Sequence, residues 1–190
     1  MGNFYVNHAV VGADAATVVS VVRSLKRHAY VYQSDAHLAF VYDQSSDTQD
    51  VDVIQELAIM IGQSTKGVVF AAVNHDDDVL VYGLYKAGDM IDNYNSFPGY
   101  WDNSGDTPWG GNGAVLAAAF GKPEVAEKIN DVLHSDRHTY AFELDRHKQI
   151  SNLLNLPWPW CVTGYRHIAS DQVSRENIRL IDCSPIIETK

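Results

Sequence analysis

The sequence predicts an α+β fold, namely a ferredoxin-like antiparallel sheet with added strands and a C-terminal helical half. Three observations lead to this prediction. Apolar residues alternate in several short segments, as in half-buried strands, and recur every three or four residues in others, as in helices. The first segments run strand, helix, strand, strand, helix, strand, which is the order of the ferredoxin-like split βαβ pattern. Aspartates that can cap a helix precede both helical segments.

The elements of the first half follow from these periods and caps. Asp14 is expected to cap the first helix, and either Asp47 or Asp50 the second. Both helices should cover a single face of the sheet, which gives a two-layer sandwich. The predicted elements are a strand over residues 4–11, a helix over 15–27, strands over 30–33 and 37–42, a helix that ends near Gly67, two strands within 68–85 and a strand over 90–94.

The second half begins with an irregular connection. Residues 93–113 follow neither period and are rich in glycine, asparagine, aspartate and large aromatics. Helices are then predicted over 114–120, from Pro123 onward and over about 143–155, with a final strand over 161–168. We therefore divide the chain into a ferredoxin-like domain, residues 1–102, and a helical half, residues 103–190, and expect the two to pack as one unit.

The composition limits the class of protein and of partner. Of 190 residues, 46% are hydrophobic and 20% are charged, as in globular domains. The formal net charge of −10 disfavours nucleic acid and anionic membranes, because both are recognised by clustered Lys and Arg. It suits a basic protein partner, or it keeps the chain soluble. We expect a cytoplasmic protein with reduced thiols at Cys161 and Cys183, because neither a secretory signal nor an apolar run of about 18 residues is visible. The oligomeric state stays open.

The most distinctive motif is an acidic turn, His75-Asp-Asp-Asp78, between two apolar strands. His75, Asp76 and Asp78 offer nitrogen and oxygen ligands that suit a transition metal, with Asp92 as a conceivable fourth ligand. That interpretation makes the chain a small metal-dependent enzyme of the hydrolase class. The alternative, which we favour, is a solvated hairpin tip without a metal or other cofactor, because Asp is an ordinary turn former and consecutive side chains point in different directions.

The irregular loop supplies a second candidate site. Phe97 and Tyr100 are expected to anchor it on the sheet. The predicted partner-binding surface combines aromatic side chains with neighbouring carboxylates: Tyr100, Trp101, Asp102, Asp106 and Trp109. Aromatic residues are frequent anchors of protein interfaces, and acidic charge steers basic partners. In the competing interpretation, both tryptophans lie buried under the C-terminal helices.

Three weaker motifs have structural explanations. Residues 109–113 could offer backbone N–H groups to an anion, but they lack the Lys-Ser/Thr of a P-loop, so a flexible helix entrance is expected. Residues 102–113 fail the EF-hand pattern, which requires Gly at the sixth place and Glu at the twelfth. Cys161 could act as a nucleophile with His147 or His167, but its apolar neighbours predict a buried thiol.

Three blocks of sequence resemble those of a family of uncharacterised bacterial proteins, in the same order along most of the chain. The blocks are Asn74-His-Asp-Asp-Asp-Val-Leu-Val-Tyr82, Tyr94-Asn-Ser-Phe-Pro-Gly-Tyr100, and Leu153-Leu-Asn-Leu-Pro157 with Gly164-Tyr-Arg-His-Ile168. The resemblance implies a bacterial, cytoplasmic origin and transfers no site, because that family has no established activity. A looser likeness, in size and acidity, is to immunity proteins that neutralise bacterial toxins. We therefore expect a non-enzymatic protein of the immunity or inhibitor type that recognises a protein partner, with the metal-dependent enzyme as the alternative.

Overall fold

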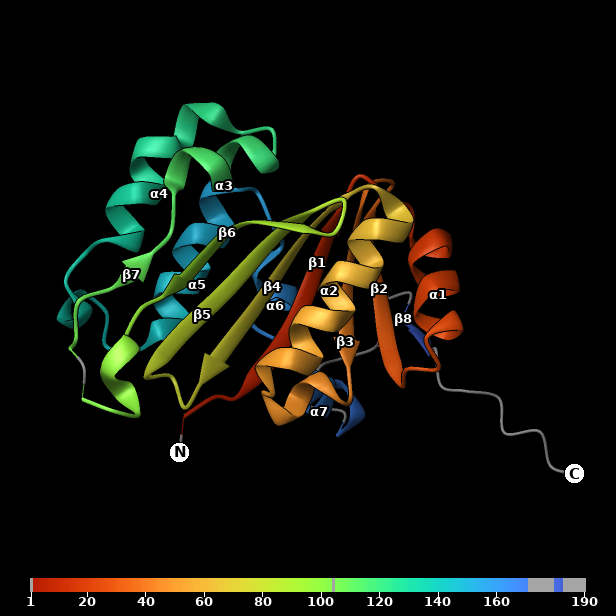
Figure 1. Ribbon diagram of the computed structural model, residues 1–190, viewed down its shortest axis with the longest axis horizontal. Helices are drawn as coiled ribbons and strands as arrows, with labels where there is room; N and C mark the ends of the chain where they lie inside the picture. Colours follow the sequence, from red (N-terminus) through yellow and green to blue (C-terminus); the bar gives the residue numbers. More distant parts are fainter. Residues whose placement is uncertain (1, 104, 171–179, 183–190) are drawn as a thin grey trace, which may run out of the picture.

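The computed structural model describes residues 2–103, 105–170 and 180–182 of the chain (Figure 1). The strands are β1 (Tyr5–Val11), β2 (Ala29–Asp35), β3 (Leu38–Asp43), β4 (Val68–His75), β5 (Val79–Lys86), β6 (Asp89–Asn95), β7 (Trp109–Gly110) and β8 (Leu180–Asp182). The α-helices are α1 (Ala15–Ser24), α2 (Val51–Thr65), α3 (Gly113–Ala119), α4 (Ala126–Leu133), α5 (Glu143–Leu153), α6 (Trp158–Cys161) and α7 (Tyr165–Ala169).

All of these strands join one sheet in the order β7-β6-β5-β4-β1-β3-β2-β8, and every neighbouring pair is antiparallel. The α+β class and the antiparallel sheet are therefore confirmed. The alternation of side chains sets the register, because a shift of one residue would turn the buried set outward. In the centre, for example, Ala9 lies opposite both Phe40 and Phe70.

Helices α1 and α2 cover one face of the sheet, which we call the front face because it is turned toward the viewer in Figure 1. Their apolar sides pack against the front residues of β1, β3 and β4 in one buried cluster. Asp14 caps α1 by accepting a hydrogen bond from the backbone N–H of Thr17 (2.7 Å). Of the two aspartates considered for α2, Asp50 is the cap. Asp47 is buried instead and accepts from the backbone N–H of Arg166 (2.9 Å).

The C-terminal helices cover the opposite face, which we call the back face (Figure 1). Leu116, Ile129 and Ile150 from these helices pack against large back residues of the sheet, among them Phe70 and Tyr82. The expected two-layer sandwich is therefore wrong for the chain as a whole, which has three layers. The repeat of apolar residues showed that the C-terminal segments are helical, but it did not show which face of the sheet they cover.

The strand expected over residues 161–168 is also wrong. These residues belong to the end of α6, a connection and α7. Their backbone is satisfied without a strand partner, because the side-chain amide of Asn7 donates to the carbonyls of Cys161 (2.6 Å) and Thr163 (3.0 Å). Short apolar runs do not distinguish a strand from a buried helix, which explains the error.

A candidate binding groove on the open part of the sheet

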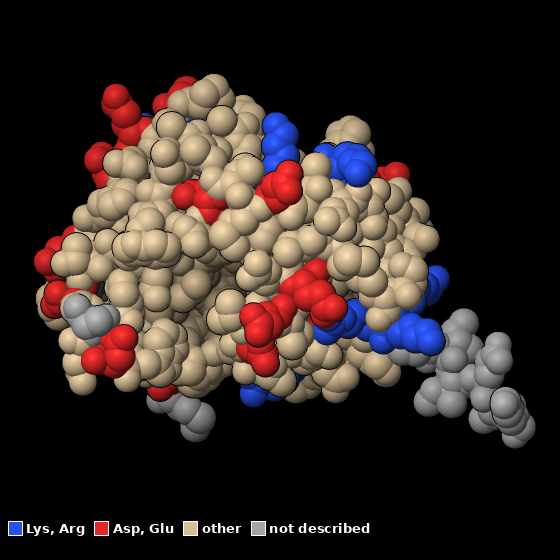
Figure 2. Space-filling model, viewed as in Figure 1, with Lys and Arg blue, Asp and Glu red and all other residues tan. Residues whose placement is uncertain are grey.

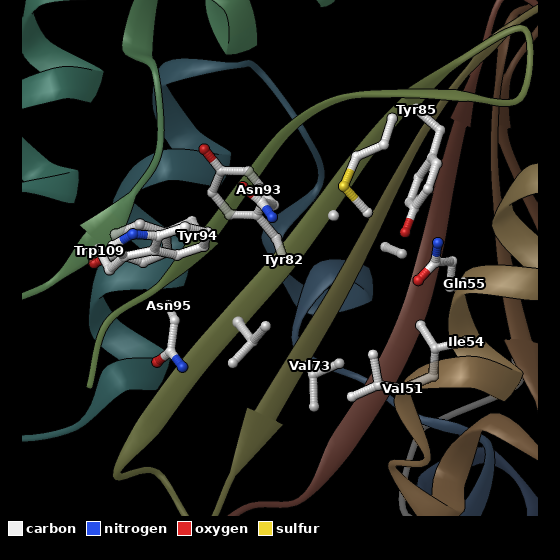
Figure 3. A pocket seen from close by; sticks show the side chains of 14 residues that line it. Val51, Ile54, Gln55, Val73, Tyr82, Tyr85, Asn93, Tyr94, Asn95 and Trp109 are labelled. Atoms are coloured by element: carbon white, nitrogen blue, oxygen red, sulfur yellow. The ribbon is translucent and has the colours of Figure 1, made fainter. Parts of the chain in front are cut away.

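The front face is only partly covered. Helix α2 touches the β5–β6 hairpin at one end, where Gly62 and Gly88 meet so closely that a Cβ on Gly62 would lie 2.7 Å from the Gly88 nitrogen. From this contact α2 and β6 diverge (Figure 1), and the space between them is an open, wedge-shaped groove of about 220 Å³ (Figure 3). Its lining is Val51, Ile54, Gln55, Ala71, Val73, Val81, Tyr82, Gly83, Tyr85, Met90, Asn93, Tyr94, Asn95 and Trp109.

The floor of the groove is made by the front residues of β5 and β6. Because side chains alternate along a strand, Val81 and Gly83 point forward from β5 while Tyr82 points back into the core. Across the ladder, Asn95 lies opposite Val81 and Asn93 lies opposite Gly83. These four front residues are smaller than the back residues Tyr82 and Tyr94 between them, and this difference hollows the surface.

The rim of the groove carries exposed apolar side chains. Val51 at the start of α2 is 68% exposed, Met90 on β6 is 45% exposed and Trp109 on β7 is 58% exposed. Isolated apolar residues on a surface are normal, but these three border one apolar hollow. The groove therefore forms one continuous apolar patch that reaches solvent.

Two glycines hold Trp109 beside the groove. Gly110 and Gly111 have φ angles of +69° and +77°, which residues with a side chain rarely adopt. A Cβ on Gly110 would lie 2.4 Å from the carbonyl oxygen of Asn93, so only glycine lets β7 come this close to β6. The glycine-rich segment thus positions a tryptophan. Its helix entrance is capped by Asn112, which accepts from the backbone N–H groups of Ala114 and Val115.

The polar groups in the groove are neutral. Gln55, Asn93 and Asn95 contribute amides, and the Gln55 amide points toward the Tyr85 hydroxyl (Figure 3). Burial raises the pKa of Tyr85, so its hydroxyl keeps its proton and can donate a hydrogen bond. Among the described residues that line the groove there is no carboxylate, imidazole or thiol. The groove therefore offers apolar contacts and hydrogen bonds rather than acid–base chemistry.

Exposed carboxylates stand next to two of the rim residues of this neutral hollow. Asp50 and Asp52 flank Val51 in the chain, and Asp89 precedes Met90. All three aspartates are exposed. Figure 2 shows red side chains along the α2 side of the hollow and further ones at its outer edge. The groove is thus an apolar site with an acidic rim.

The sequence-predicted residues fall into two groups. Trp109 borders the groove, whereas Tyr100 and Trp101 lie beside the acidic turn, where their rings meet the His75 ring edge to face with centroids 5.5 Å apart. Trp101 is 62% exposed and Tyr100 is half-buried. Asp102 and Asp106 are exposed on the same loop. Both tryptophans are therefore accessible and not buried under the C-terminal helices.

The side chains of the acidic turn point in different directions. Asp76 accepts from the backbone N–H of Gly2 (2.7 Å), and the buried Asp77 accepts from the backbone N–H of Asn3 (2.9 Å). Asp78 is exposed. The conceivable fourth ligand, Asp92, accepts from the Tyr82 hydroxyl (2.7 Å) instead. The turn thus fastens the N-terminal segment to the sheet, and the described residues contain no group of three or more His, Cys, Asp or Glu that could hold a metal ion.

The proton position on His75 follows from its neighbour. The Gln49 amide nitrogen donates to the carbonyl of Asn74 (2.8 Å), so its oxygen faces His75 as an acceptor at 2.5 Å from Nδ1. Nδ1 of His75 therefore carries a proton, and in the neutral ring Nε2 holds the lone pair. Partial burial, together with the charges of Asp78 and Asp76, raises the pKa of Tyr100, which agrees with the position of the acidic turn beside the aromatic loop.

The thiol of Cys161 is part of the back-face core. The side chain is buried, and burial raises its pKa to about 12. A nucleophilic thiol needs a lowered pKa and access to substrate. Cys161 has neither, so it is structural. Cys183 lies outside the described residues.

The sequence analysis missed the floor and the α2 wall of the groove. A signal was present on the two strands, where Gly83, Asn93 and Asn95 alternate with the large residues Tyr82 and Tyr94. Small and amide residues on one side of a strand, with aromatics on the other, indicate an open face opposite a core face. The contribution of α2 could not be found in this way, because it depends on the angle of the helix.

No helix among the described residues combines the length and the apolar character that crossing a bilayer requires. Comparison with protein-family models, with curated proteins and with solved structures gives no significant match. Function is therefore inferred from the geometry and chemistry of this chain.

Proposed function

We propose that this protein is a non-enzymatic binding protein of the immunity or inhibitor type, which recognises a protein partner through the groove and the exposed Trp109 beside it. The observation that carries the proposal is the uncovered apolar part of the front face, where Val51, Met90 and Trp109 border a hollow with neutral amides. Contiguous apolar surface is costly to expose to water, and in monomeric proteins it frequently marks an interface.

The dimensions of the groove favour a protein partner over an enclosed small-molecule site. Its volume is about 220 Å³. Pockets for drug-sized ligands are larger, at about 300–1,000 Å³, and bury most of the ligand. A shallow hollow with an aromatic rim instead resembles the pockets that receive a few anchor side chains in protein interfaces.

The aromatic loop and the acidic charge extend this surface. Tyr100 and Trp101 would make a second contact next to the acidic turn, with Asp102 and Asp106 on the intervening loop. The net charge of −10 suits a basic partner, because opposite charge speeds association and fixes orientation. The proposed surface thus includes the residues expected from the sequence, divided between the groove and the acidic turn, and adds the groove to them.

Two further assignments belong to the same proposal. We assign β1–β4 with α1 and α2 to a ferredoxin-like unit, which is supported by the strand order β4-β1-β3-β2 with antiparallel neighbours and by the position of both helices on the front face. We also propose a bacterial, cytoplasmic origin. The sequence resemblance and the free, buried thiol of Cys161 support it.

Site-specific photo-crosslinking tests the binding function. A benzophenone amino acid at position 109, in cells that naturally produce the protein, should crosslink a defined partner, and the same probe at position 158 should not. Trp158 is a matched control because it is 44% exposed and belongs to α6 among the back-face helices.

The purified partner must then bind the unmodified protein. Trp109→Ala should weaken this binding by about 2 kcal/mol or more, about thirtyfold in Kd, while Trp158→Ala leaves it unchanged. Equal losses in both variants, or crosslinks to the same proteins from both positions, would refute the groove as the binding site.

A further inference from the structure

We infer that the segment recognised by the groove is an amphipathic helix with an apolar stripe flanked by Lys or Arg, which lies beside α2 as a third helix of the front layer. This inference rests on the proposed function and specifies the chemistry of the partner. It follows from the shape of the groove, from the nature of the sheet edge and from the charges on the rim.

The shape of the groove suits a helix. One wall is a helix already, since Val51, Ile54 and Gln55 of α2 face the hollow. The floor is the front surface of β5 and β6, and the front residues of β4 lie between it and α2. Helices on one face of a sheet pack side by side at about 8–10 Å between axes. α1 and α2 already lie side by side on this face, and among the described residues Figure 1 shows no helix at the next position in the layer, over β5 and β6.

The sheet edge next to the groove is poorly suited to the addition of a partner strand. The edge strand β7 has two residues, Trp109 and Gly110, and Pro108 stands directly before it. Strand addition needs a row of unpaired backbone groups. β7 is too short to present one, and because in the described part of the chain it pairs only with Tyr94 and Asn95 of β6, a partner strand would gain just the short remaining part of β6 that begins at Asp89. A partner segment therefore gains more from side chains placed in the hollow than from backbone pairing.

The charges on the rim select a basic helix. Asp50 and Asp52 stand at the wide end of the wedge, next to Val51. Asp89 stands beside Met90 toward the narrow end, where the exposed Lys86 lies opposite it in the ladder, so the excess of negative charge is at the wide end. The described lining between the two ends is uncharged. A helix whose apolar stripe enters the hollow would hold its flanking side chains over this rim, where Lys and Arg meet opposite charge and Glu would be repelled.

The test uses a synthetic helix of about 20 residues with Leu at positions i, i+3, i+4 and i+7 and Lys at the flanking positions, since that length forms a stable helix on a surface. A matched peptide carries Glu in place of each Lys. Fluorescence anisotropy should show that the Leu-Lys helix binds at least about tenfold more tightly than the Leu-Glu helix, and that its binding weakens as salt is added.

Variants of the protein test whether the Leu-Lys helix binds at the groove. Trp109→Ala should weaken binding of the Leu-Lys helix at least tenfold, and the double variant Asp52→Asn, Asp89→Asn about fivefold, since each rim charge contributes little alone. The control Glu127→Gln removes an exposed carboxylate from α4 and should change nothing. Equal affinity for the two peptides, or equal effects of the rim and control variants, overturns the inference.

Further outcomes distinguish a bound helix from other occupants of the groove, and failure of the helix inference from failure of the proposed function. A dimer in sedimentation that Trp109→Ala dissociates would assign the groove to a second copy of the chain and overturn the helix. If position 109 crosslinks a partner through an extended or acidic segment, the helix inference fails while the binding function stands. If the Leu-Lys helix binds through Trp109 but no partner crosslinks there in cells, the proposed function fails.

Discussion

The two faces of strands β5 and β6 differ in how far helices cover them. On the back face Tyr82, Leu84 and Tyr94 are fully buried under the C-terminal helices, and Tyr82 and Tyr94 stack with ring centroids 5.4 Å apart. On the front face of the same strands, Gly83 and Asn93 are only half-buried and border the groove. The large residues Tyr82 and Tyr94 point toward the back face, so the groove residues of the front face can contact a partner without loss of the back-face core.

The back face of the sheet, which we call the closed face because the C-terminal helices cover it, is held by polar groups as well as by apolar contacts. The open face is the part of the front face that borders the groove. Arg146 of α5 is fully buried, pairs with Glu143 (2.8 Å), donates to the carbonyl of Val132 and lies over the Tyr140 ring, 4.7 Å from its centroid. These contacts join α5 to the end of α4. On the open face, by contrast, the described lining of the groove has no charged group. Substitutions on the two faces should therefore differ greatly in their effect on stability.

The largest effect is expected at Arg146. Arg146→Ala should lower the free energy of unfolding by about 3–5 kcal/mol, because it removes the cation that pairs with the buried carboxylate of Glu143 and the donor to the carbonyl of Val132 in α4. Urea denaturation of the purified variant measures the change.

Lys148 provides the matched control. It forms an ion pair with Asp145 (3.3 Å) on the same helix, with the same spacing in the chain, but both side chains are partly exposed. Lys148→Ala should cost less than about 1 kcal/mol. If both variants cost the same, the closed face does not depend on the buried pair, and the contrast between the faces is smaller than the structure indicates.

A second effect on the closed face is a dependence on pH. His147 is fully buried with Nδ1 2.8 Å from the Tyr5 hydroxyl, and burial lowers its pKa to about 4. The unfolded chain binds this proton near pH 6.5, whereas the folded chain does so only near pH 4. The contribution of the neutral His147 ring to the free energy of unfolding is therefore fully present above pH 6.5, and it is lost as the pH falls from there to 4. The difference of about 2.5 pKa units corresponds to about 3 kcal/mol.

Denaturation curves at pH 7 and pH 4.5 test this effect. His147→Gln should be less stable than the unmodified protein at pH 7 but should lose less stability between the two pH values, because glutamine does not titrate. Burial also lowers the pKa of His8, so a residual loss at low pH is expected in the variant. An unchanged pH dependence in His147→Gln would mean that this imidazole does not constrain the closed face.

The sequence was sufficient for elements whose signals are local. The helices after Asp14 and Asp50 were predicted because capping and helical spacing involve neighbouring residues. The acidic turn was correctly predicted as a hairpin connection, but the expectation of a solvated tip is wrong at Asp77, which is buried. The attachment to Gly2 and Asn3 was not predicted, since those contacts join residues far apart in the chain. The groove was missed for the same reason: its opening depends on the contact of Gly62 with Gly88 and on the direction of α2.

The two predicted sites show a further limit. His75 was assigned to a metal-ligand set and Trp101 to a partner surface, yet their rings lie edge to face in one cluster with Tyr100. Trp109, assigned to the same surface as Trp101, borders the groove with a different set of neighbours. The sequence analysis placed Trp101 and Trp109 in one site because they belong to one loop. In the folded protein the two residues lie in different places, Trp101 beside the acidic turn and Trp109 beside the groove.

The smallest effect on stability is expected at Trp109, on the open face. Trp109→Ala should change the free energy of unfolding by no more than about 0.5 kcal/mol, because the side chain is largely in solvent. Trp160→Ala is the contrasting variant. Trp160 is buried at 8% exposure against Tyr32, with centroids 4.2 Å apart, and its loss should cost about 3–5 kcal/mol.

Acrylamide quenching of single-tryptophan proteins gives the same contrast without a large loss of stability. A protein that keeps only Trp109 should be quenched strongly, and one that keeps only Trp160 should be shielded. The degree of quenching of Trp109 decides how a loss of binding in Trp109→Ala is interpreted. If Trp109 is shielded, or if its removal destabilises the fold as much as that of Trp160, the residue belongs to the core. The open face would then lack the anchor that distinguishes it from the closed one, and a binding loss in Trp109→Ala would report damage to the fold instead of a lost contact.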